Sequence, residues 1–235
     1  SRAAILTGQY SHINGVTVFN RFDSSRMTVA RLLQKGGYYT GMIGKWHLGS
    51  DPVGFDRWEI LPGQGAYNDP LLYTATGEKT YTSRYATDVI TDLAIDFVQK
   101  RPRNQPFFLM VHHKAPHRPW EPDAVHAAQF ASRRIPEPST LWDSYATRTD
   151  AIHENRQRVA ADLTRRDLKL PPPADLAAAE LTDWLSTKPD TVTTVRDGKS
   201  VTLTGEPLTR WKYQRYMQDY LATLQSVDDN VGRLL

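Results

Sequence analysis

Cationic and imidazole side chains follow each of two predicted strands. Lys45 and His47 come at the end of the first strand, and Lys114 and His117 follow the second. Strands of an open α/β sheet bind ligands beyond their carboxyl ends, so we expect these four side chains to lie together. Lysine supplies a point charge for an anion, and histidine can donate a hydrogen bond or a proton near neutral pH. The pattern favours a site for a small oxyanion.

Arg2 extends this pattern, because it lies in the first turn of a predicted helix. Its guanidinium offers a fork that suits sulfate or phosphate, and a helix N-terminus itself favours an anion. Spacing alone leaves a second interpretation open, in which these side chains are surface or structural residues of well-packed loops.

Helices and strands alternate in the first half of the chain, as an α/β fold requires. Residues 1–6 are a predicted helix. Ser25 or Thr28 can cap a second helix in which Val29, Leu32 and Leu33 face inward. Residues 38–43 are a predicted strand that leads into Lys45 and His47.

The next segments repeat the helix-to-strand step. Residues 50–83 are rich in Gly, Pro, Asp and Thr and are predicted to form a long ordered loop. Residues 85–101 show the i, i+3, i+4 apolar spacing of a helix. The apolar run at 107–111 is typical of a central strand covered on both faces.

Residues 121–207 are more polar, and we interpret them as an insertion over the core instead of an independent domain. Two helices are expected near 140–152 and 154–166, and a hairpin is expected around the turn at Asp197-Gly198. Residues 208–235 are predicted to form one amphipathic helix. Its expected apolar face comprises Tyr213, Met217, Tyr220, Leu224, Val227, Val231 and Leu234.

The composition, with 40% hydrophobic and 23% charged residues among 235, fits a soluble globular protein. The net charge is +3 and no long Lys/Arg run occurs, so we expect no nucleic-acid partner. No apolar run approaches the ~20 residues that span a bilayer, so we expect no membrane partner either. The absence of cysteine excludes disulfides and cysteine metal sites within this stretch. Because it lacks an initiator Met, we expect the chain to be an internal fragment.

Three motifs in order resemble the sulfatase family. Ser1–Gly8 (SRAAILTG) is similar to the end of the first sulfatase signature, in which Cys or Ser, any residue, Pro, Ser and Arg precede a short helix and Thr-Gly. Gly44–Gly49 (GKWHLG) resembles the second signature, and Ala115–Pro119 (APHRP) resembles the third catalytic segment. Within the family, the motifs most resemble those of carbohydrate sulfatases such as N-acetylglucosamine-6-sulfatase. The resemblance implies an incomplete α/β/α sandwich of the alkaline-phosphatase-like type, with residues 1–235 as part of the N-terminal catalytic domain.

The resemblance also implies hydrolysis of sulfate esters by a formylglycine nucleophile, expected three residues before Ser1. Arg2 would steady the formylglycine hydrate, and Lys45 would bind the hydrate and a sulfate oxygen. His47 would take a proton from the geminal hydroxyl when the sulfated intermediate breaks down. His117 would contact the sulfate and assist the leaving oxygen.

Calcium is the cofactor that the family implies, with ligands outside this chain. The acidic run Asp228–Asn230 lies within the predicted last helix, so we expect no metal ligands here. The partner would be a small-molecule or oligosaccharide sulfate ester. A periplasmic or secreted location is suspected from the family, and the fragment alone is expected to be inactive.

Three residues are candidates for binding the substrate. Lys114 could touch sulfate or a sugar carboxylate, and Arg118 and Trp120 could bind the substrate, although a surface or packing role is open for each. Other functions also stay open: an arylsulfatase, a phosphoester or phosphonate hydrolase of the same superfamily, and a non-catalytic carbohydrate-binding pseudoenzyme. A Cys or Ser at the nucleophile position would support a sulfatase, and an unmodified Thr a phosphatase.

Overall fold

The computed structural model describes residues 2–235, apart from the side chain of Arg196. Ser1, which opens the first predicted helix, lies outside the described residues. The chain divides into two compact units: residues up to Pro116 with Ser226–Leu235, and His117–Gln225. The predicted single partial domain and the insertion bounds 121–207 remain predictions.

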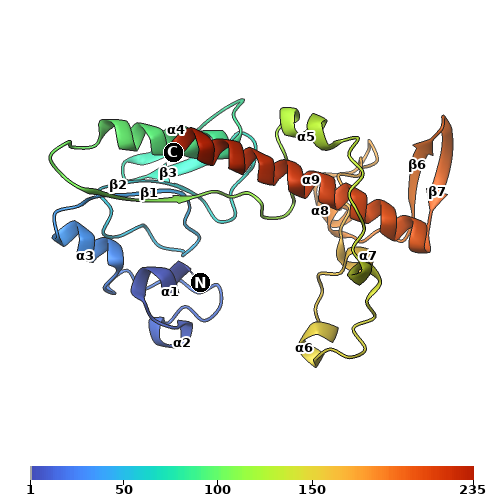
Figure 1. Ribbon diagram of the computed structural model, residues 1–235, viewed down its shortest axis with the longest axis horizontal. Helices are drawn as coiled ribbons and strands as arrows, with labels where there is room; N and C mark the ends of the chain where they lie inside the picture. The colour runs from blue at the N-terminus through green and yellow to red at the C-terminus, as the bar shows by residue number, and fades with distance from the viewer. Residues whose placement is uncertain (1) are drawn as a thin grey trace. The chain divides into compact units, whose positions relative to one another are not determined.

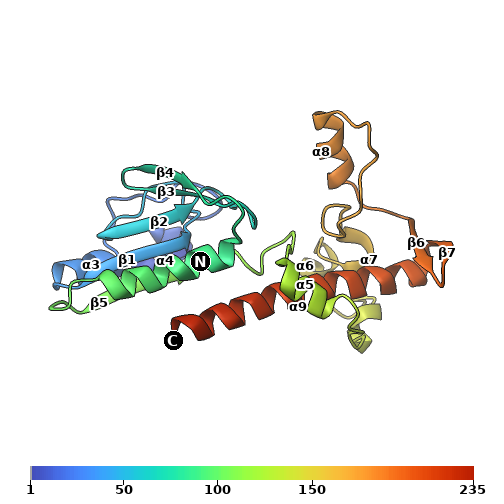
Figure 2. The same cartoon turned by 90° about the horizontal axis from the view of Figure 1, so that it is seen from above.

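A five-stranded sheet in the order β4-β3-β2-β1-β5 is the centre of the first unit. Strands β1 (Tyr39–Lys45), β2 (Arg57–Leu61) and β5 (Phe107–His112) run parallel. Strands β3 (Leu71–Thr74) and β4 (Gly77–Thr80) add an antiparallel hairpin (Figure 2). The three parallel strands therefore end at one edge of the sheet.

Helices cover both faces of this sheet (Figure 1). Helices α1 (Arg2–Thr7) and α3 (Val29–Lys35) lie on one face, with the short α2 (Ser11–Asn14) beside α1. Helix α4 (Ala86–Lys100) covers the other face. The predicted α/β/α arrangement is confirmed.

The sheet separates two hydrophobic cores, because successive side chains of a strand point to opposite faces. Met42 packs with Leu6 and Ala30 on the side of α1 and α3. Its neighbour Ile43 packs with Ile90 and Phe97 on the side of α4.

The predicted helices at 1–6 and 85–101 and the strand at 38–43 are confirmed as α1, α4 and β1. The Thr28 hydroxyl caps α3 by accepting a hydrogen bond from the backbone N–H of Arg31 at 3.2 Å. Of the predicted inward residues of α3, Val29 and Leu33 are half-buried. The prediction is wrong for Leu32, which is 57% exposed, since α3 presents Ala30 to the core instead.

Two predictions about the sheet are wrong. The expected loop at 50–83 contains β2, β3 and β4, because Gly and Pro there punctuate short strands instead of replacing them. Among the described strands, β5 lies at the edge of the sheet and pairs with β1 alone. The strand buried on both faces is β1, whose residues 40–45 are all buried.

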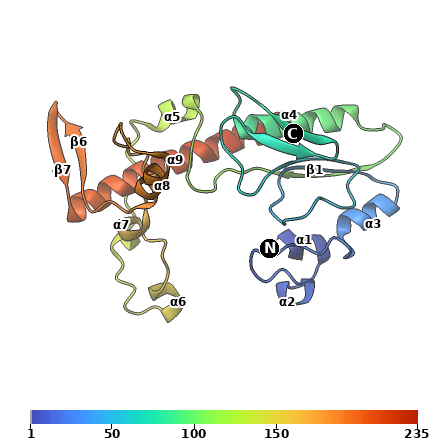
Figure 3. The same cartoon turned by 180° about the vertical axis from the view of Figure 1, so that it is seen from behind.

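The second unit is built from short elements. They are α5 (Ala124–Phe130), a 3-10 turn η1 (Ser139–Trp142), α6 (Asp150–His153), α7 (Val159–Asp162), α8 (Ala178–Ser186), β6 (Val192–Arg196) and β7 (Lys199–Leu203). The predicted hairpin is confirmed: Asp197 and Gly198 take φ values of 48° and 73° between β6 and β7. The hairpin packs on the first turns of the last helix through Val192, Leu203 and Leu208 (Figure 3).

The long helices expected at 140–152 and 154–166 are wrong, and α5 and α8 were not foreseen. Polar side chains in this segment bond to nearby backbone and hold turns in place of helix. Asp143, for example, accepts from the backbone N–H of Tyr145 at 2.8 Å.

The last helix, α9 (Gly205–Leu234), confirms the predicted long helix but not its whole apolar face. Tyr213 is buried, whereas Val231 is 41% exposed. Buried positions along its second half are small or polar: Ala222, Thr223, Ser226 and Asn230. The Asn230 amide donates to Asp88 of α4 and to the Ser226 carbonyl, both at 2.8 Å. No helix among the described residues is both long and apolar enough to cross a membrane.

Candidate functional site

Polar residues gather where the three parallel strands end. Lys45 is the last residue of β1, and Lys114 follows the end of β5. Gln64 lies in the turn after β2, between Gly63 and Gly65, whose φ values are 50° and 69°. Parallel strands that end at one edge thus place three segments, far apart in sequence, around a single point.

Gln64 joins the predicted residues of the first unit. The Lys45 ammonium donates to Gln64 Oε1 at 2.5 Å, and the Lys114 ammonium donates to the Gln64 carbonyl at 3.1 Å. The Gln64 amide nitrogen Nε2 lies 3.4 Å from His47 Nε2. Sequence reasoning missed Gln64, although a polar residue between two glycines, three residues after the RWEIL strand, is a signal that could have found it.

Gly44 explains how Lys45 reaches this edge. Its φ is 100°, and a Cβ built on it would lie 2.1 Å from the His112 carbonyl oxygen. A residue without a side chain is therefore required for β1 and β5 to approach this closely. His47 also has a positive φ, 55°, so the chain turns sharply just after Lys45.

The Lys45 ammonium is buried in a positive region. Its side chain is 3% exposed, and burial, together with the charges of Lys114 and Arg2, lowers the pKa of Lys45 to about 8. Burial lowers the pKa of Arg2 as well. His112, a further residue that sequence reasoning did not select, has a lowered pKa, first through burial and also through the Arg2 charge, against a hydrogen bond to the Lys45 carbonyl. Buried positive charges of this kind favour a bound anion.

A pocket of about 520 Å³ opens beside His47. Phe19, which is 87% exposed, places its ring centroid 5.7 Å from that of His47. Arg21, Asp51 and Tyr73 also line the pocket, so aromatic and charged groups face the same space.

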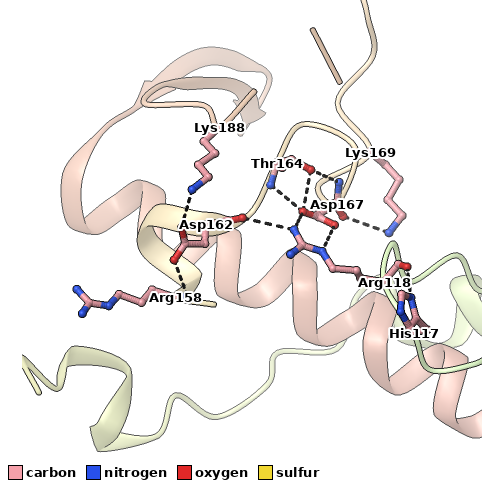
Figure 4. Close-up of polar contacts among 8 residues, drawn as sticks. All are labelled: His117, Arg118, Arg158, Asp162, Thr164, Asp167, Lys169 and Lys188. Carbon is pink, nitrogen blue, oxygen red and sulfur yellow. Dashed lines mark hydrogen bonds and ion pairs between the residues drawn. The ribbon is translucent and has the colours of Figure 1, made fainter. Parts of the chain in front are cut away.

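His117, Arg118 and Trp120 belong to the second unit. Figure 4 shows the polar contacts of His117 and Arg118. His117 Nδ1 donates to the Arg118 carbonyl at 2.6 Å, and the Arg118 guanidinium pairs with Asp167. The Trp120 ring packs edge-on against Tyr216 with centroids 4.5 Å apart. The structure therefore gathers Arg2, Lys45, His47 and Lys114 in the first unit, and the meeting of His117 with them remains a prediction.

Calcium requires several oxygen ligands at one point. Within residues 2–235, no three His, Cys, Asp or Glu side chains gather in a way that could hold a metal ion. The described residues therefore do not form a calcium cage. Asn230, in the acidic run of α9, instead holds α4 through Asp88.

Comparison with known proteins shows which family the chain resembles. The sulfatase family model matches residues 1–235. An N-acetylglucosamine-6-O-sulfatase of Bacteroides thetaiotaomicron is 43% identical over 255 residues, which cover 100% of this chain and 45% of that protein. An N-acetylglucosamine-6-sulfatase of Capra hircus is 31% identical over 145 residues, covering 51% of this chain and 26% of that protein.

A solved structure of a protein in complex with its substrate D-glucosamine-2-N,6-O-disulfate superimposes with a TM-score of 0.85 at 40% identity. The match covers 100% of this chain and 51% of that chain. The chain thus spans about half, or less, of the length of these relatives. With the family model matching throughout and the α/β/α fold shared, the chain belongs to the sulfatase family.

Proposed function

We propose that the complete protein hydrolyses sulfate esters of carbohydrates, with 6-O-sulfated glucosamine residues as its leading substrates. The observation that carries this proposal is the pair of buried lysines at the strand ends, Lys45 and Lys114, with the charge of Arg2 from α1 acting on Lys45. The names of the relatives support glucosamine as the sugar of the substrate. One relative is called an N-acetylglucosamine-6-O-sulfatase, and a structural neighbour holds a glucosamine disulfate.

In this proposal the cationic group binds the sulfate. Lys45 and Lys114 would donate to sulfate oxygens in place of Gln64, and Arg2 would add its charge from α1. Fixed positive groups that require no reorganisation stabilise charge as it develops on the transferred group. His47, beside the same point, would accept a proton during breakdown of the sulfated intermediate, and His117 would assist the leaving oxygen. The formylglycine that the family implies would supply the nucleophile, and calcium would neutralise sulfate charge.

The pocket beside His47 is the proposed place for the sugar. The exposed ring of Phe19 offers an apolar face for the C–H side of a pyranose, and Arg21 and Asp51 can bond its hydroxyl groups. We expect Phe19→Ala to raise KM for a sulfated sugar about tenfold with little change for a small aryl sulfate. Val125→Ala, at an exposed position of α5 that does not line this pocket, serves as the control. Equal effects of Phe19→Ala on both substrates would contradict binding of the sugar in this pocket.

The proposal is tested by sulfate release from a panel of esters by the complete protein. The panel holds N-acetylglucosamine 6-sulfate, a 4-sulfated hexosamine, an aryl sulfate and a phosphate monoester. The highest kcat/KM is expected for the 6-sulfate. A preference for the aryl sulfate would make the protein an arylsulfatase, and a preference for the phosphate would make it a phosphatase. Binding without turnover of any ester would favour a pseudoenzyme.

The location is a separate proposal. We infer a periplasmic or secreted protein from the family, and the partner is the sulfated saccharide itself. Cell fractionation followed by immunodetection tests the location, and recovery of the protein solely in the cytoplasmic fraction would contradict it.

A further inference from the structure

A buried carboxylate of the second unit holds the residue that follows His117. The Asp167 side chain is 3% exposed and accepts two hydrogen bonds from the Arg118 guanidinium, from Nε at 3.0 Å and from Nη2 (Figure 4). The backbone N–H and the hydroxyl of Thr164 each donate to the same carboxylate at 2.8 Å. Burial alone raises the pKa of Asp167, and the bonds from Arg118 and Thr164 outweigh it, so the pKa lies below its usual value. Asp167 is therefore an ionised acceptor that matches the arginine fork.

The surroundings of this pair are tied down as well. Arg118 Nη2 also donates to the Asp162 carbonyl at 3.4 Å. The Asp162 carboxylate pairs with Lys188 at 2.6 Å and accepts from the backbone N–H of Arg158 at 2.9 Å. The acceptors of Arg118 thus belong to a segment that is itself braced by ion pairs and hydrogen bonds.

Trp120 is anchored from the other side. The Lys169 ammonium donates to the Trp120 carbonyl and pairs with Asp219 of α9 at 2.9 Å. The Trp120 ring packs against Tyr216 of the same helix. Both neighbours of Pro119 are therefore held by the second unit, one through a side chain and one through its carbonyl and ring.

A hydrogen bond between neighbouring residues connects this anchoring to the His117 ring. His117 Nδ1 lies 2.6 Å from the Arg118 carbonyl oxygen, and a carbonyl can accept but not donate. The proton of a neutral imidazole is then on Nδ1, and Nε2 is the nitrogen that accepts. The acceptor that selects this tautomer belongs to Arg118, whose side chain is held by Asp167.

We infer that Asp167 is a positioning residue for His117: through the Arg118 fork it fixes the carbonyl that sets the orientation and tautomer of the imidazole. The inference rests on the proposed function, in which His117 acts on the sulfate ester. Arg118, predicted from the sequence as a substrate contact, serves the histidine in this account. A residue of the segment that the sequence presents as a polar insertion thereby acts on the proposed chemistry through His117.

Matched variants of the complete protein test the inference. Asp167→Asn keeps the shape of the side chain and removes its charge, and Arg118→Lys keeps the charge without the fork. Asp143→Asn is the control, because it breaks another carboxylate–arginine pair of the same unit, Asp143–Arg148 at 2.8 Å. We expect the first two variants to lower kcat about 10- to 100-fold, as for a misplaced catalytic group, with KM within about twofold. The control should keep the parent kcat.

A second readout separates positioning from stability. Histidine-selective nitrogen NMR should show the Nδ1–H tautomer of His117 in the parent and a mixture of tautomers in Asp167→Asn, at temperatures where both are folded. The double variant Arg118→Lys/Asp167→Asn should lose no more kcat than the worse single variant, because the two residues act as one unit.

Several results would overturn the inference. One is a folded Asp167→Asn protein with the parent kcat and tautomer. Another is a loss of activity that follows the unfolded fraction while the His117 signal stays unchanged. If the parent releases no sulfate from any ester, the proposed function fails, and the tautomer measurement, which needs no substrate, still decides whether Asp167 positions His117.

Discussion

At the scale of single residues, the proposed sulfate site contains a lysine whose pKa is unusually low. Burial and the charges of Lys114 and Arg2 bring the pKa of Lys45 from 10.5 to about 8. Between pH 8 and 10.5 the unfolded chain binds the additional proton, so the contribution of Lys45 to stability rises with pH across this window. Below pH 8 the folded protein carries the cost of a buried ammonium, about 1.4 kcal/mol for each unit of lowered pKa. A sulfate ion would relieve that cost.

Sulfate should therefore raise the melting temperature of the protein more below pH 8 than above pH 9. Lys45→Met should abolish most of this shift and should stabilise the sulfate-free protein at pH 7, because it removes the buried charge. Calorimetric melting with and without excess sulfate measures both effects. Lys35→Met, at the exposed end of α3, is the control. An unchanged sulfate effect in Lys45→Met would place the anion elsewhere.

Gln64 gives a second prediction at this scale. Its Oε1 accepts from Lys45, so Gln64→Glu would put a carboxylate beside the ammonium. The pKa of Lys45 should rise by about 1–3 units, moving the alkaline limb of kcat/KM upward. The same carboxylate repels sulfate, so product inhibition by sulfate should weaken. Gln99→Glu on the exposed end of α4 should change neither quantity. A pH profile of Gln64→Glu identical to that of the parent would contradict the hydrogen bond between Lys45 and Gln64.

At the scale of elements, the site depends on the close approach of β1 and β5 at Gly44. An alanine there would combine a positive φ with a Cβ 2.1 Å from the His112 carbonyl oxygen. We expect Gly44→Ala to lower the free energy of unfolding by about 1–3 kcal/mol or more, measured by urea denaturation. Gly63→Ala is the matched control, because Gly63 also has a positive φ but no atom within 4 Å of the added Cβ. Equal losses in the two variants would assign the effect to backbone strain instead of the contact between strands.

The elements that sequence periodicity specifies were predicted, and those that depend on partners were not. Helix α4 has an apolar stripe that only a helix can bury, and the Asp197-Gly198 turn fixes its hairpin locally. Strands β2 to β4 are short and become strands through pairing with β1 and with one another. Because residues 50–83 are predicted as a loop, the sequence does not indicate that Gln64, in the turn after β2, belongs to the site.

At the scale of the whole molecule, part of the site could be predicted from the positions of residues at strand ends, and the contacts within the second unit could not. Lys45, His47 and Lys114 lie together in the first unit, as the strand-end pattern indicates. Asp167 pairs with Arg118 across 49 residues of sequence, and no local pattern connects the two. Long-range ion pairs of this kind are set by the packing of the second unit, so they follow from the folded structure alone.

The central claim, that the cationic group at the strand ends binds the sulfate being transferred, is tested most directly by one rate. That rate is kcat/KM for sulfate release from N-acetylglucosamine 6-sulfate by the complete protein and its Lys45→Ala variant. The account predicts a loss of about 100-fold or more, as for removal of one charge-stabilising donor, with Lys35→Ala unchanged. A Lys45→Ala rate within about threefold of the parent, less than ~0.7 kcal/mol of barrier, would contradict it.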